Sequence, residues 1–574
     1  MIVKKYLALA SFLFGMTVAY AVPAMPGKHL LQQPDGTIVE ANIVGDEHFH
    51  YYETEAGEIL LHDDYGMLRP CVIGSDGVLR AEGTITGEPS TEAIRNAVMA
   101  TMTRKRTEAA RAAAKPDEIK LSFPTTGTVT GLILLCDFQD VKMTEEATEE
   151  HYRQLCNEHG FSSDAAHGSV IDYFTAQSHG LFTPQFDVFG KVTLPYERAH
   201  YGMTNDVNNL FRDAALEADR MGLDFSKYDV NNDGYVDFLF VVFAGHGQAQ
   251  GGPYDSVWPA MQDLSEYVFD YFDGLNLGVA ACSCELKGGS GANLDGISTI
   301  CHEFGHILGL ADIYDTSSQG GHGMGHYDIM DVGTYNDNLR TPPGYTAFEK
   351  FSLGWMKPTV LEQSASDIEL MPFDESNEAV FIVNPDNTNE YFTLENRQKR
   401  DWDSGIPGHG LVISYCHYEP RLWRRNTVNA AAAGYEHIHI MAADNIWITD
   451  ENGKPFSNEA GDTYPGQSGN TSFTGTSVPA AIWMSSKRPM IQAITNIRES
   501  ESGTITFDYN SGEAGTGDIA IAPESGIRVE GNTIVAPEDT KVFDMSGRCV
   551  GTANLAPGVY VVRSGDNVVK IAIH

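Results

Sequence analysis

The segment His302-Glu303-Phe304-Gly305-His306-Ile307-Leu308-Gly309-Leu310-Ala311-Asp312 sets two histidines four residues apart, with an aspartate six residues after the second. Four residues are about one helical turn, so both imidazoles lie on the same face of a helix. We expect that helix to run from Asp295 to Leu308, with Asp295 as its N-cap and one apolar stripe facing the core. Gly309 then ends the helix, because glycine readily adopts the left-handed cap conformation.

This spacing is typical of a metal centre. Two imidazoles on one helix face can bind the same Zn²⁺, and an aspartate that follows the turn can be the third protein ligand. The pattern H-E-x-x-H-x-x-G-x-x-D is a metzincin-type arrangement with aspartate where histidine is more usual. It predicts a zinc site at His302, His306 and Asp312, with Glu303 as the general base that takes a proton from water. The alternative is a helix with two hydrogen-bonded core histidines.

A later segment fits a tight turn beneath that metal. In Tyr327-Asp328-Ile329-Met330-Asp331 we expect Met330 to form the Met-turn, although methionine in such a run is otherwise common core packing. The residue that stabilises the oxyanion is not identified by any pattern. Tyr335 is a candidate, and plain packing is the more favoured interpretation of it.

The acidic segment 229–237 predicts a second metal site. Side-chain oxygens occur at alternate positions and Gly234 allows a sharp turn, as in calcium-binding loops. The segment departs from an EF-hand because position twelve is Phe240 and not glutamate, so further ligands must come from elsewhere. The alternative is an acidic turn before a strand. The expected Ca²⁺ ligands are Asp229, Asn231, Asp233, Asp237 and the backbone carbonyl of Tyr235.

Composition excludes one class of partner. The 574 residues include 78 Asp and Glu against 38 Lys and Arg, a formal net charge of −40. A surface of this sign repels phosphate backbones, so nucleic acid is not an expected partner. Apolar residues make up 42% of the chain, which is ordinary for a globular protein.

The N-terminus predicts export. Lys4 and Lys5 precede an apolar stretch, and Ala19-Tyr20-Ala21 supplies small residues for cleavage before Val22. The apolar stretch is shorter than the ~20 residues of a membrane-spanning helix, which disfavours an anchor. We therefore expect a signal peptide over 1–21.

The rest of the chain predicts four parts. Segment 22–115 combines short strands with a helix carrying Arg104-Lys105-Arg106, which favours a pro-segment and activation linker over a small β domain on a helical spacer. Strands alternate with helices over 116–360, as in an α/β catalytic domain. Short strands over 361–509 indicate a β-sandwich accessory domain. Residues 510–574 indicate a linker and a small Ig-like β domain.

The pro-segment contains Cys71. A thiolate there could occupy the open zinc position until activation, although a buried structural cysteine is the favoured interpretation.

Several stretches resemble the immune inhibitor A family of bacterial metalloproteases. The resemblance extends from about 30 to 508 and implies a metzincin-like catalytic domain with zinc at His302, His306 and Asp312. Ala311 stands where the family commonly has proline, and Asp331-Val332 stands where small residues follow the Met-turn. The similar stretches are Gln33 to Thr37, Gly45 to Glu47, Ser169 to Phe174, Asp224 to Asp229, His302 to Asp315 and Gly344 to Trp355.

The C-terminal segment carries a second resemblance. Val542 to Arg548 and Leu555 to Val562 are similar to the sorting domain of type IX secretion cargo, which implies passage across an outer membrane. A plain β accessory domain is the alternative.

These features together predict a multidomain α/β plus β protein that is a secreted zinc metalloendopeptidase, made as a zymogen and acting on extracellular proteins or peptides. Its C-terminal domain would engage the secretion machinery. One alternative is a surface binding or adhesion protein with a vestigial protease domain, which the intact His302, Glu303, His306 and Asp312 disfavour. A zinc hydrolase of a non-peptide bond is disfavoured by the Met-turn and by the resemblance.

Overall fold

The computed structural model describes residues 21–574, except for 75–77, 83–91, 113–122, 266, 317–322, 431–434, 450–454, 512–527, 531–532, 538–539, 545–548, 554, 556–557, 565–566 and 574. The predicted signal peptide lies outside the described residues apart from Ala21. Within the described part of the chain, no helix has the length and apolarity that crossing a bilayer requires. The fold is mixed α/β and forms two compact units, Met1–Ser511 and Gly512–His574.

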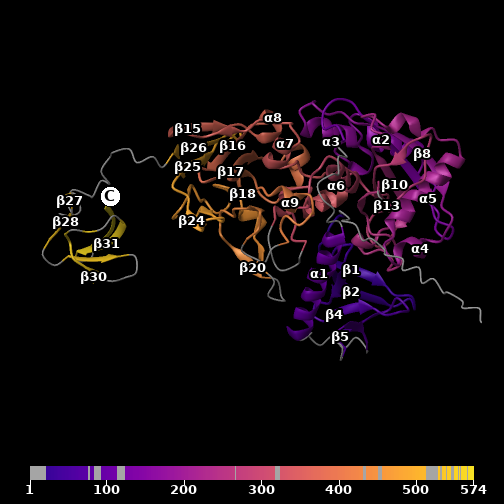
Figure 1. Ribbon diagram of the computed structural model, residues 1–574, viewed down its shortest axis with the longest axis horizontal. Helices are drawn as coiled ribbons and strands as arrows, with labels where there is room; N and C mark the ends of the chain where they lie inside the picture. The colour runs from indigo at the N-terminus through magenta and orange to yellow at the C-terminus, as the bar shows by residue number, and fades with distance from the viewer. Residues whose placement is uncertain are drawn as a thin grey trace, which may run out of the picture. The chain divides into compact units, whose positions relative to one another are not determined.

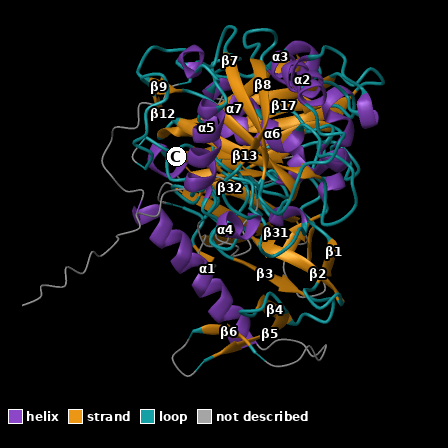
Figure 2. Ribbon diagram, turned by 90° about the vertical axis from the view of Figure 1, so that its right-hand side faces the viewer, coloured by secondary structure: helices purple, strands orange, loops and turns teal. Residues whose placement is uncertain are grey.

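The N-terminal part of the first unit is an antiparallel sheet packed on one long helix, α1 (Glu92–Ala112) (Figure 1, indigo; Figure 2). Turns such as Pro34-Asp35-Gly36 connect neighbouring strands, as turn-forming residues predict. The six strands, in sheet order, are β1 (Lys28–Gln32), β2 (Ile38–Gly45), β3 (His50–Glu53), β4 (Ile59–His62), β5 (Leu68–Ile73) and β6 (Leu79–Ala81).

Cys71 lies in the small core between this sheet and α1, against Val98 and Met102. Burial raises the pKa of its thiol to about 11, so the thiol stays protonated at neutral pH. The metal-ligand clusters of the described residues contain no cysteine. The hypothesis that Cys71 caps the zinc is therefore wrong, and the cysteine is part of the packing.

A five-stranded sheet forms the centre of the next part. Strands β7, β8, β10 and β13 are parallel, and β11 pairs antiparallel at the edge. The residues of β7, β10 and β13 are almost all buried, as expected for parallel strands covered on both faces, whereas the edge strand β8 is largely half-buried or exposed. The sheet order is β11 (Met261–Asp263), β13 (Val279–Leu286), β10 (Leu239–His246), β7 (Thr130–Asp137) and β8 (Gln185–Thr193); β9 (Tyr235–Val236) pairs with β12 (Asn276–Leu277).

Helices pack around this sheet and share its core (Figure 2). Ser169 and Thr346 begin two of them with capping boxes, in which side chain and backbone satisfy one another. The helices are α2 (Glu149–Asn157), α3 (Val170–Gln177), α4 (Arg198–Gly202), α5 (Val207–Arg220), α6 (Ser298–Ile307) and α7 (Ala347–Ser352).

Helix α6 carries the two histidines and begins later than the sequence indicates. Ile297 is its N-cap residue, and Asp295 lies too early to cap it. The Asp295 carboxylate instead accepts hydrogen bonds from the amide of Gly296 (2.9 Å) and from the side chain of Gln250 (3.0 Å). The predicted N-cap is therefore wrong, because a tertiary partner takes the carboxylate. Gly309 follows the helix with φ 101°, as the C-cap prediction requires.

The remainder of the first unit has two sheets that enclose one core, with short helices α8 (Phe373–Ser376) and α9 (Pro420–Trp423) beside them. One sheet is β14 (Thr359–Val360), β16 (Ala379–Asn384), β17 (Asn387–Arg397), β18 (Gly410–His417) and β19 (Ile438–Ile440). The other sheet is β15 (Ala365–Leu370), β26 (Ile505–Asn510), β25 (Ala493–Glu499) and β22 (Phe473–Thr474). Two further two-stranded sheets are β20 (Trp447–Thr449) with β21 (Pro455–Ser457), and β23 (Ile482–Trp483) with β24 (Arg488–Pro489).

The second unit is a small all-β body in the residues that the structure describes. Its core includes Ile534, Val542, Tyr560 and Val562. The strands are β27 (Arg528–Glu530) paired with β28 (Thr533–Val535), and a sheet ordered β30 (Cys549–Val550), β29 (Lys541–Asp544), β31 (Gly558–Ser564) and β32 (Asn567–Ile573).

Candidate metal centre

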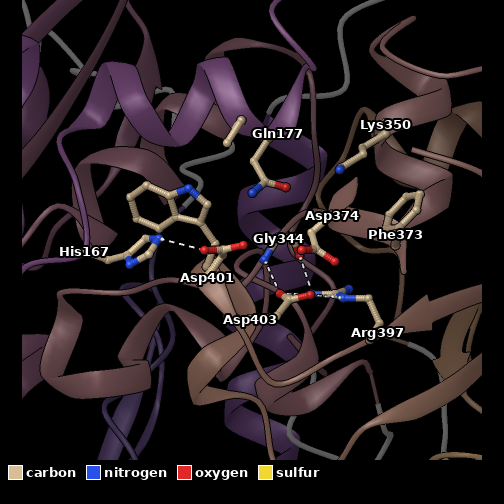
Figure 3. A pocket seen from close by; sticks show the side chains of 11 residues that line it. His167, Gln177, Gly344, Lys350, Phe373, Asp374, Arg397, Asp401 and Asp403 are labelled. Carbon is tan, nitrogen blue, oxygen red and sulfur yellow. Dashed lines mark hydrogen bonds and ion pairs between the residues drawn. The ribbon is translucent and has the colours of Figure 1, made fainter. Parts of the chain in front are cut away.

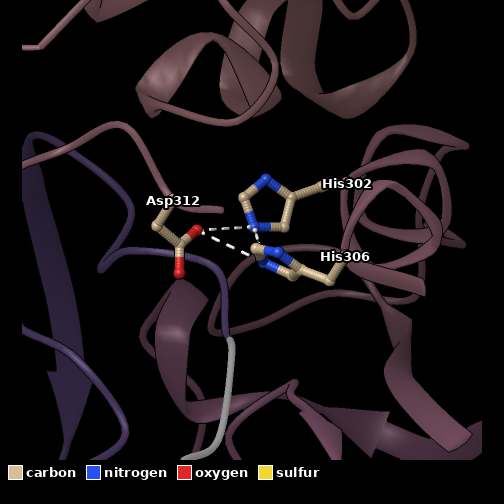
Figure 4. Close-up of side chains that lie close together, drawn as sticks. All are labelled: His302, His306 and Asp312. Atoms are coloured by element: carbon tan, nitrogen blue, oxygen red, sulfur yellow. Dashed lines mark hydrogen bonds and ion pairs between the residues drawn. The ribbon is translucent and has the colours of Figure 1, made fainter. Parts of the chain in front are cut away.

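His302, His306 and Asp312 meet at one point inside the molecule (Figure 4). The two histidines project from α6, and the loop after Gly309 returns Asp312 toward them. The Nε2 atoms of the two rings are 3.2 Å apart, and each is 3.3 Å from Oδ1 of Asp312. All three side chains are buried. The sequence-predicted ligand set is therefore brought together.

The second nitrogen of each ring fixes which atoms face the cluster. Nδ1 of His302 is 2.7 Å from the carbonyl oxygen of Ile329, and Nδ1 of His306 is 3.0 Å from that of Leu310. A carbonyl oxygen only accepts, so each Nδ1 carries the proton and each Nε2 presents a lone pair. Oδ1 of Asp312 has no hydrogen-bond donor among the described residues. Three electron-pair donors thus converge, and a divalent cation fits this arrangement.

The charge of Asp312 suits such a cation. Burial raises the pKa of its carboxyl, and protonated imidazoles on His306 and His302 would outweigh burial and lower that pKa. A divalent cation between the three groups would favour the ionised carboxylate in the same way.

Glu303 is buried beside this cluster. Its Oε1 accepts a hydrogen bond from the backbone N–H of Val22 at 3.2 Å, while Oε2 has no partner among the described residues. Burial, and next the negative charge of Asp312, raise the pKa of Glu303 well above its usual value. A carboxylate with a raised pKa is a stronger base, which is what proton transfer from water requires.

The N-terminal segment 21–25 lies in the same site, and no sequence pattern indicated this. Figure 4 shows an indigo segment, the colour of the N-terminal residues, passing beside the three side chains. Ala21 and Val22 are almost fully buried. Three side chains donate to this backbone: Tyr314 Oη to the Ala21 oxygen (2.8 Å), Trp258 Nε1 to the Val22 oxygen (2.9 Å) and Tyr335 Oη to the Pro23 oxygen (2.5 Å).

A residue from the second half of the chain holds the third candidate ligand. Asn426, in the loop after α9, donates from its amide nitrogen to Oδ2 of Asp312 and accepts from the Asp312 backbone N–H at 2.7 Å. Its backbone is left-handed, with φ 49°, a conformation that asparagine tolerates better than most residues. Asn429 adds a bond to the Ile313 carbonyl at 2.6 Å. Sequence reasoning missed both residues, since no local motif marks them.

Met330 lies beneath α6, where the sequence predicts it. It is fully buried, and a Cβ added at Gly305 would stand 2.7 Å from its sulfur, so the helix needs glycine at that point. The preceding Ile329 carbonyl is the acceptor for His302. The turn and the ligand helix therefore position one another.

The predicted calcium loop is closed by its own hydrogen bonds. Carboxylates of Asp229 accept from the amides of Asp233 and Gly234, both at 3.0 Å, and Asp237 accepts from Val230 at 2.6 Å. Burial, with smaller effects from Asp233 and Asp229, raises the pKa of Asp237 to about 6. The three aspartates do not form one of the clusters whose candidate ligand atoms all lie within 4.8 Å of one another among the described residues. Calcium at this loop stays a prediction.

A second group of candidate ligands lies at the end of β18, after it and just before β19: His417, Glu419 and His437. Both ring nitrogens of His417 already have neighbours, Asn387 at 3.0 Å and Tyr435 at 3.1 Å. His417 is therefore engaged within the protein.

A cavity of about 250 Å³ lies elsewhere, where α3 and α7 meet α8 and β17 (Figure 3). Arg397 and Asp403 pair at its wall, with Nε to Oδ2 at 2.5 Å, and Asp403 also accepts from the Gly344 amide at 2.9 Å. Burial lowers the pKa of Lys350, which also lines it, to about 8. None of the metal-ligand candidates lines this cavity. The cavity therefore belongs to the junction between the part with the parallel sheet and the part with the two sheets that follow it.

Comparison with known proteins agrees with the site. Residues 132–358 match the family model described as immune inhibitor A peptidase M6, catalytic domain. The chain is 28% identical to Immune inhibitor A of Bacillus thuringiensis subsp. alesti over 273 residues, which is 38% of this chain and 38% of that protein. It is 25% identical to the pre-pro-metalloprotease PrtV of Vibrio cholerae serotype O1 strain M66-2 over 280 residues, 40% of this chain and 30% of that protein.

The matched regions thus span less than half of the length of these curated relatives. The family model, over residues 132–358, includes all of α6 together with Asp312 and Met330, whereas Asn426 and segment 21–25 lie outside it. The part of the chain that carries the cluster of His302, His306 and Asp312 is therefore similar to the catalytic domain of an M6 metallopeptidase.

Proposed function

We propose that this protein is a secreted zinc metalloendopeptidase that hydrolyses peptide bonds of extracellular proteins. The observation that supports this most is the convergence of three lone pairs, from His302, His306 and Asp312, beside the buried carboxyl group of Glu303. Two histidines and one carboxylate are an established ligand set for catalytic zinc. The match of this region to M6 metallopeptidases supports the same class of reaction.

The residues of the site have separate roles in the proposed reaction. Bound Zn²⁺ would acidify the attacking water and polarise the scissile carbonyl. Glu303 accepts the proton of that water and then delivers it to the leaving amine. The Ile329 and Leu310 carbonyls keep the lone pairs of both imidazoles directed inward.

Hydrolysis of casein by the activated protein tests this proposal. We expect activity that stops with a zinc chelator, returns with Zn²⁺ and is lost in Glu303→Ala, and about one equivalent of zinc by elemental analysis. A protein that binds zinc but cleaves no protein would instead favour the surface-binding alternative, and a protein without zinc would contradict the metal assignment.

We also propose that the protein is made as a zymogen. Residues 21–25 cover Glu303 and occupy the space that a substrate needs. If the signal peptide is removed before Val22, the new α-amino group lies beside the Glu303 carboxylate. The basic cluster Arg104-Lys105-Arg106 within α1 is the expected region of activating cleavage. N-terminal sequencing of the secreted and the active forms tests both cuts.

Calcium is a further proposal, and it rests on the acidic loop 229–237. A bound Ca²⁺ would offset the repulsion between Asp229, Asp233 and Asp237 and would stabilise the turn before β9. We expect the melting temperature to rise with added CaCl₂ in the native chain and to change much less in Asp233→Asn. Equal shifts in both proteins would remove the loop as the site.

The C-terminal unit is proposed to direct type IX secretion. Its support is the sequence resemblance at Val542 to Arg548 and Leu555 to Val562. Deleting 512–574 should leave the protein inside the cell envelope, which fractionation and immunoblotting would detect. Normal release of the shortened chain would contradict this role.

A further inference from the structure

The peptide group that joins Ala21 to Val22 is held at both of its polar atoms. Its carbonyl oxygen accepts a hydrogen bond from the Tyr314 hydroxyl at 2.8 Å, and its N–H donates to Oε1 of Glu303 at 3.2 Å. Both residues of the peptide are almost fully buried. One peptide bond thus lies between a hydroxyl donor and the proposed general base.

Hydrolysis of a peptide needs these two contacts at the same bond. Negative charge develops on the carbonyl oxygen as water adds, and a donor directed at that oxygen stabilises it. The leaving nitrogen must receive a proton, and the group that delivers it has to lie close by. The Ala21–Val22 bond meets both requirements with groups that flank the metal cluster.

Tyr314 is placed firmly for such a role. It follows Asp312 by two residues, and the amide of the intervening Ile313 donates to the Met330 carbonyl at 2.8 Å. The Ile313 carbonyl is in turn fixed by Asn429. The segment that presents the Tyr314 hydroxyl is therefore tied on one side to the Met-turn and on the other to the second half of the chain.

We propose, on the basis of the proposed function, that Tyr314 is a catalytic residue that donates to the oxygen of the scissile carbonyl, and that the Ala21–Val22 peptide occupies the position of the scissile bond. As the water oxygen bonds to the carbonyl carbon, one water proton passes to Glu303 and the carbonyl oxygen gains negative charge against the Tyr314 O–H. The C–N bond then breaks, its electron pair stays on nitrogen, and Glu303 returns the proton to that nitrogen. The products are a carboxylic acid, which keeps the second water proton until it ionises to solvent, and an amine.

Tyr335 has a different place along the same backbone. Its hydroxyl donates to the oxygen of Pro23, two residues beyond Ala21, and Trp258 donates to the oxygen of Val22. In this register both residues hold the leaving-group side of a substrate and do not contact the reacting carbonyl. Tyr335, the candidate suggested by sequence, is thus a residue for substrate binding.

Paired hydroxyl deletions test this division. Tyr314→Phe in the activated enzyme should lower kcat by about 10²–10³-fold, the usual effect of losing one oxyanion donor, with KM within about 3-fold. Tyr335→Phe should raise KM several-fold with little change in kcat. Tyr196→Phe, at an exposed ring that stacks on His200, is the matched surface control and should leave both constants unchanged.

Calorimetry supplies a readout other than turnover. A phosphinic peptide with Ala-Val around the phosphorus mimics the tetrahedral species, and its affinity should fall in Tyr314→Phe by the same factor as kcat. An intact Ala-Val peptide is titrated into the Glu303→Ala variant and into the double variant that also carries Tyr314→Phe. The affinity of the peptide should be only a few-fold lower for the double variant. Equal losses for both ligands would mean that Tyr314 binds the ground state only, and the proposal would be overturned.

The register is tested with a synthetic peptide of residues 17–27. The activated enzyme should cut it between Ala21 and Val22, as mass spectrometry of the fragments would show. Cleavage only at other bonds, with casein still hydrolysed, overturns the register while the proposed function stands. Loss of casein hydrolysis in Glu303→Ala together with full activity in Tyr314→Phe overturns the catalytic role alone.

Discussion

At the scale of single residues, Asn426 controls the geometry of the candidate ligand Asp312. It bonds both the side chain and the backbone N–H of that residue, and it comes from a loop more than a hundred positions away. Partners of this kind orient a metal ligand and raise its affinity. Sequence alone gives the ligands, because a helical repeat brings His302 and His306 together, but it gives no sign of a partner so distant along the chain.

Asn426→Gly should therefore weaken zinc binding by about 10–100-fold, the usual cost of losing a ligand's supporting hydrogen bond. Glycine tolerates the left-handed backbone, so the change removes the amide without adding strain. Competition with a chromogenic chelator measures the affinity. Asn496→Gly, at an exposed position with φ 53°, is the matched control and should bind zinc as the native protein does. Unchanged affinity in Asn426→Gly would show that Asp312 is held by other means.

The same scale shows why one expectation was wrong. Asp295 has the right chemistry for an N-cap, yet Gln250 and Gly296 take its carboxylate. Local pattern cannot foresee this outcome, because it depends on which distant surface the segment meets. Cys71, by contrast, packs against α1 as the favoured interpretation of a buried structural cysteine expects.

At the scale of elements, the Met-turn rests on a pair of buried acids. Asp328, which accepts a hydrogen bond from the Met330 amide at 3.0 Å, lies near Glu349 of α7, and burial favours the protonated form of both carboxyls. Burial raises the pKa of Glu349 to about 7, and burial together with the charge of Glu349 raises the pKa of Asp328 further. In the unfolded chain both groups lose their protons near pH 4.

Stability should consequently fall as pH rises. Between about pH 4.5 and 7 the folded protein binds more protons than the unfolded chain, and stability decreases with pH wherever that is so. Asp328→Asn supplies a permanent N–H donor to Glu349. The melting temperature of this variant minus that of the native chain should therefore be larger at pH 8 than at pH 5. Thermal unfolding of the metal-free proteins measures this. Glu378→Gln, which changes an exposed carboxyl, is the control. A difference in melting temperature that does not change with pH would rule out proton binding at this pair.

The elements themselves were predictable to different degrees. Helix α6 forms inside the predicted range Asp295 to Leu308 and is followed by Gly309 as predicted, so only its start differs from the sequence-based expectation. The contact that decides the state of the site was not predictable, because segment 21–25 has no motif and is held mainly through its backbone. Hydrogen bonds to a backbone carry no sequence signature.

At the scale of the whole molecule, the N-terminal sheet and the site are linked by residues 22–27, which precede β1 at Lys28. The sheet also contacts the next part directly, for example through the rings of His50 and Trp258, whose centroids are 4.8 Å apart. The proposed latency can thus arise in two ways, from the inserted segment or from the sheet that lies beside it.

A chain that begins at Lys28 separates these sources. With Arg104, Lys105 and Arg106 replaced by glutamine to prevent processing, the chain that begins at Val22 should not hydrolyse casein, since the segment engages Trp258 and Tyr335. The chain from Lys28 keeps all six strands and should hydrolyse casein without any cut. Adding back a peptide of residues 22–27 should inhibit the enzyme in a dose-dependent way, because it supplies the carbonyl oxygens of Val22 and Pro23, to which Trp258 and Tyr335 donate. Near-ultraviolet circular dichroism checks that the sheet remains folded. A chain from Lys28 that is folded but does not hydrolyse casein would show that the sheet itself covers the active site. Insertion of residues 22–27 would then not be what keeps the enzyme inactive.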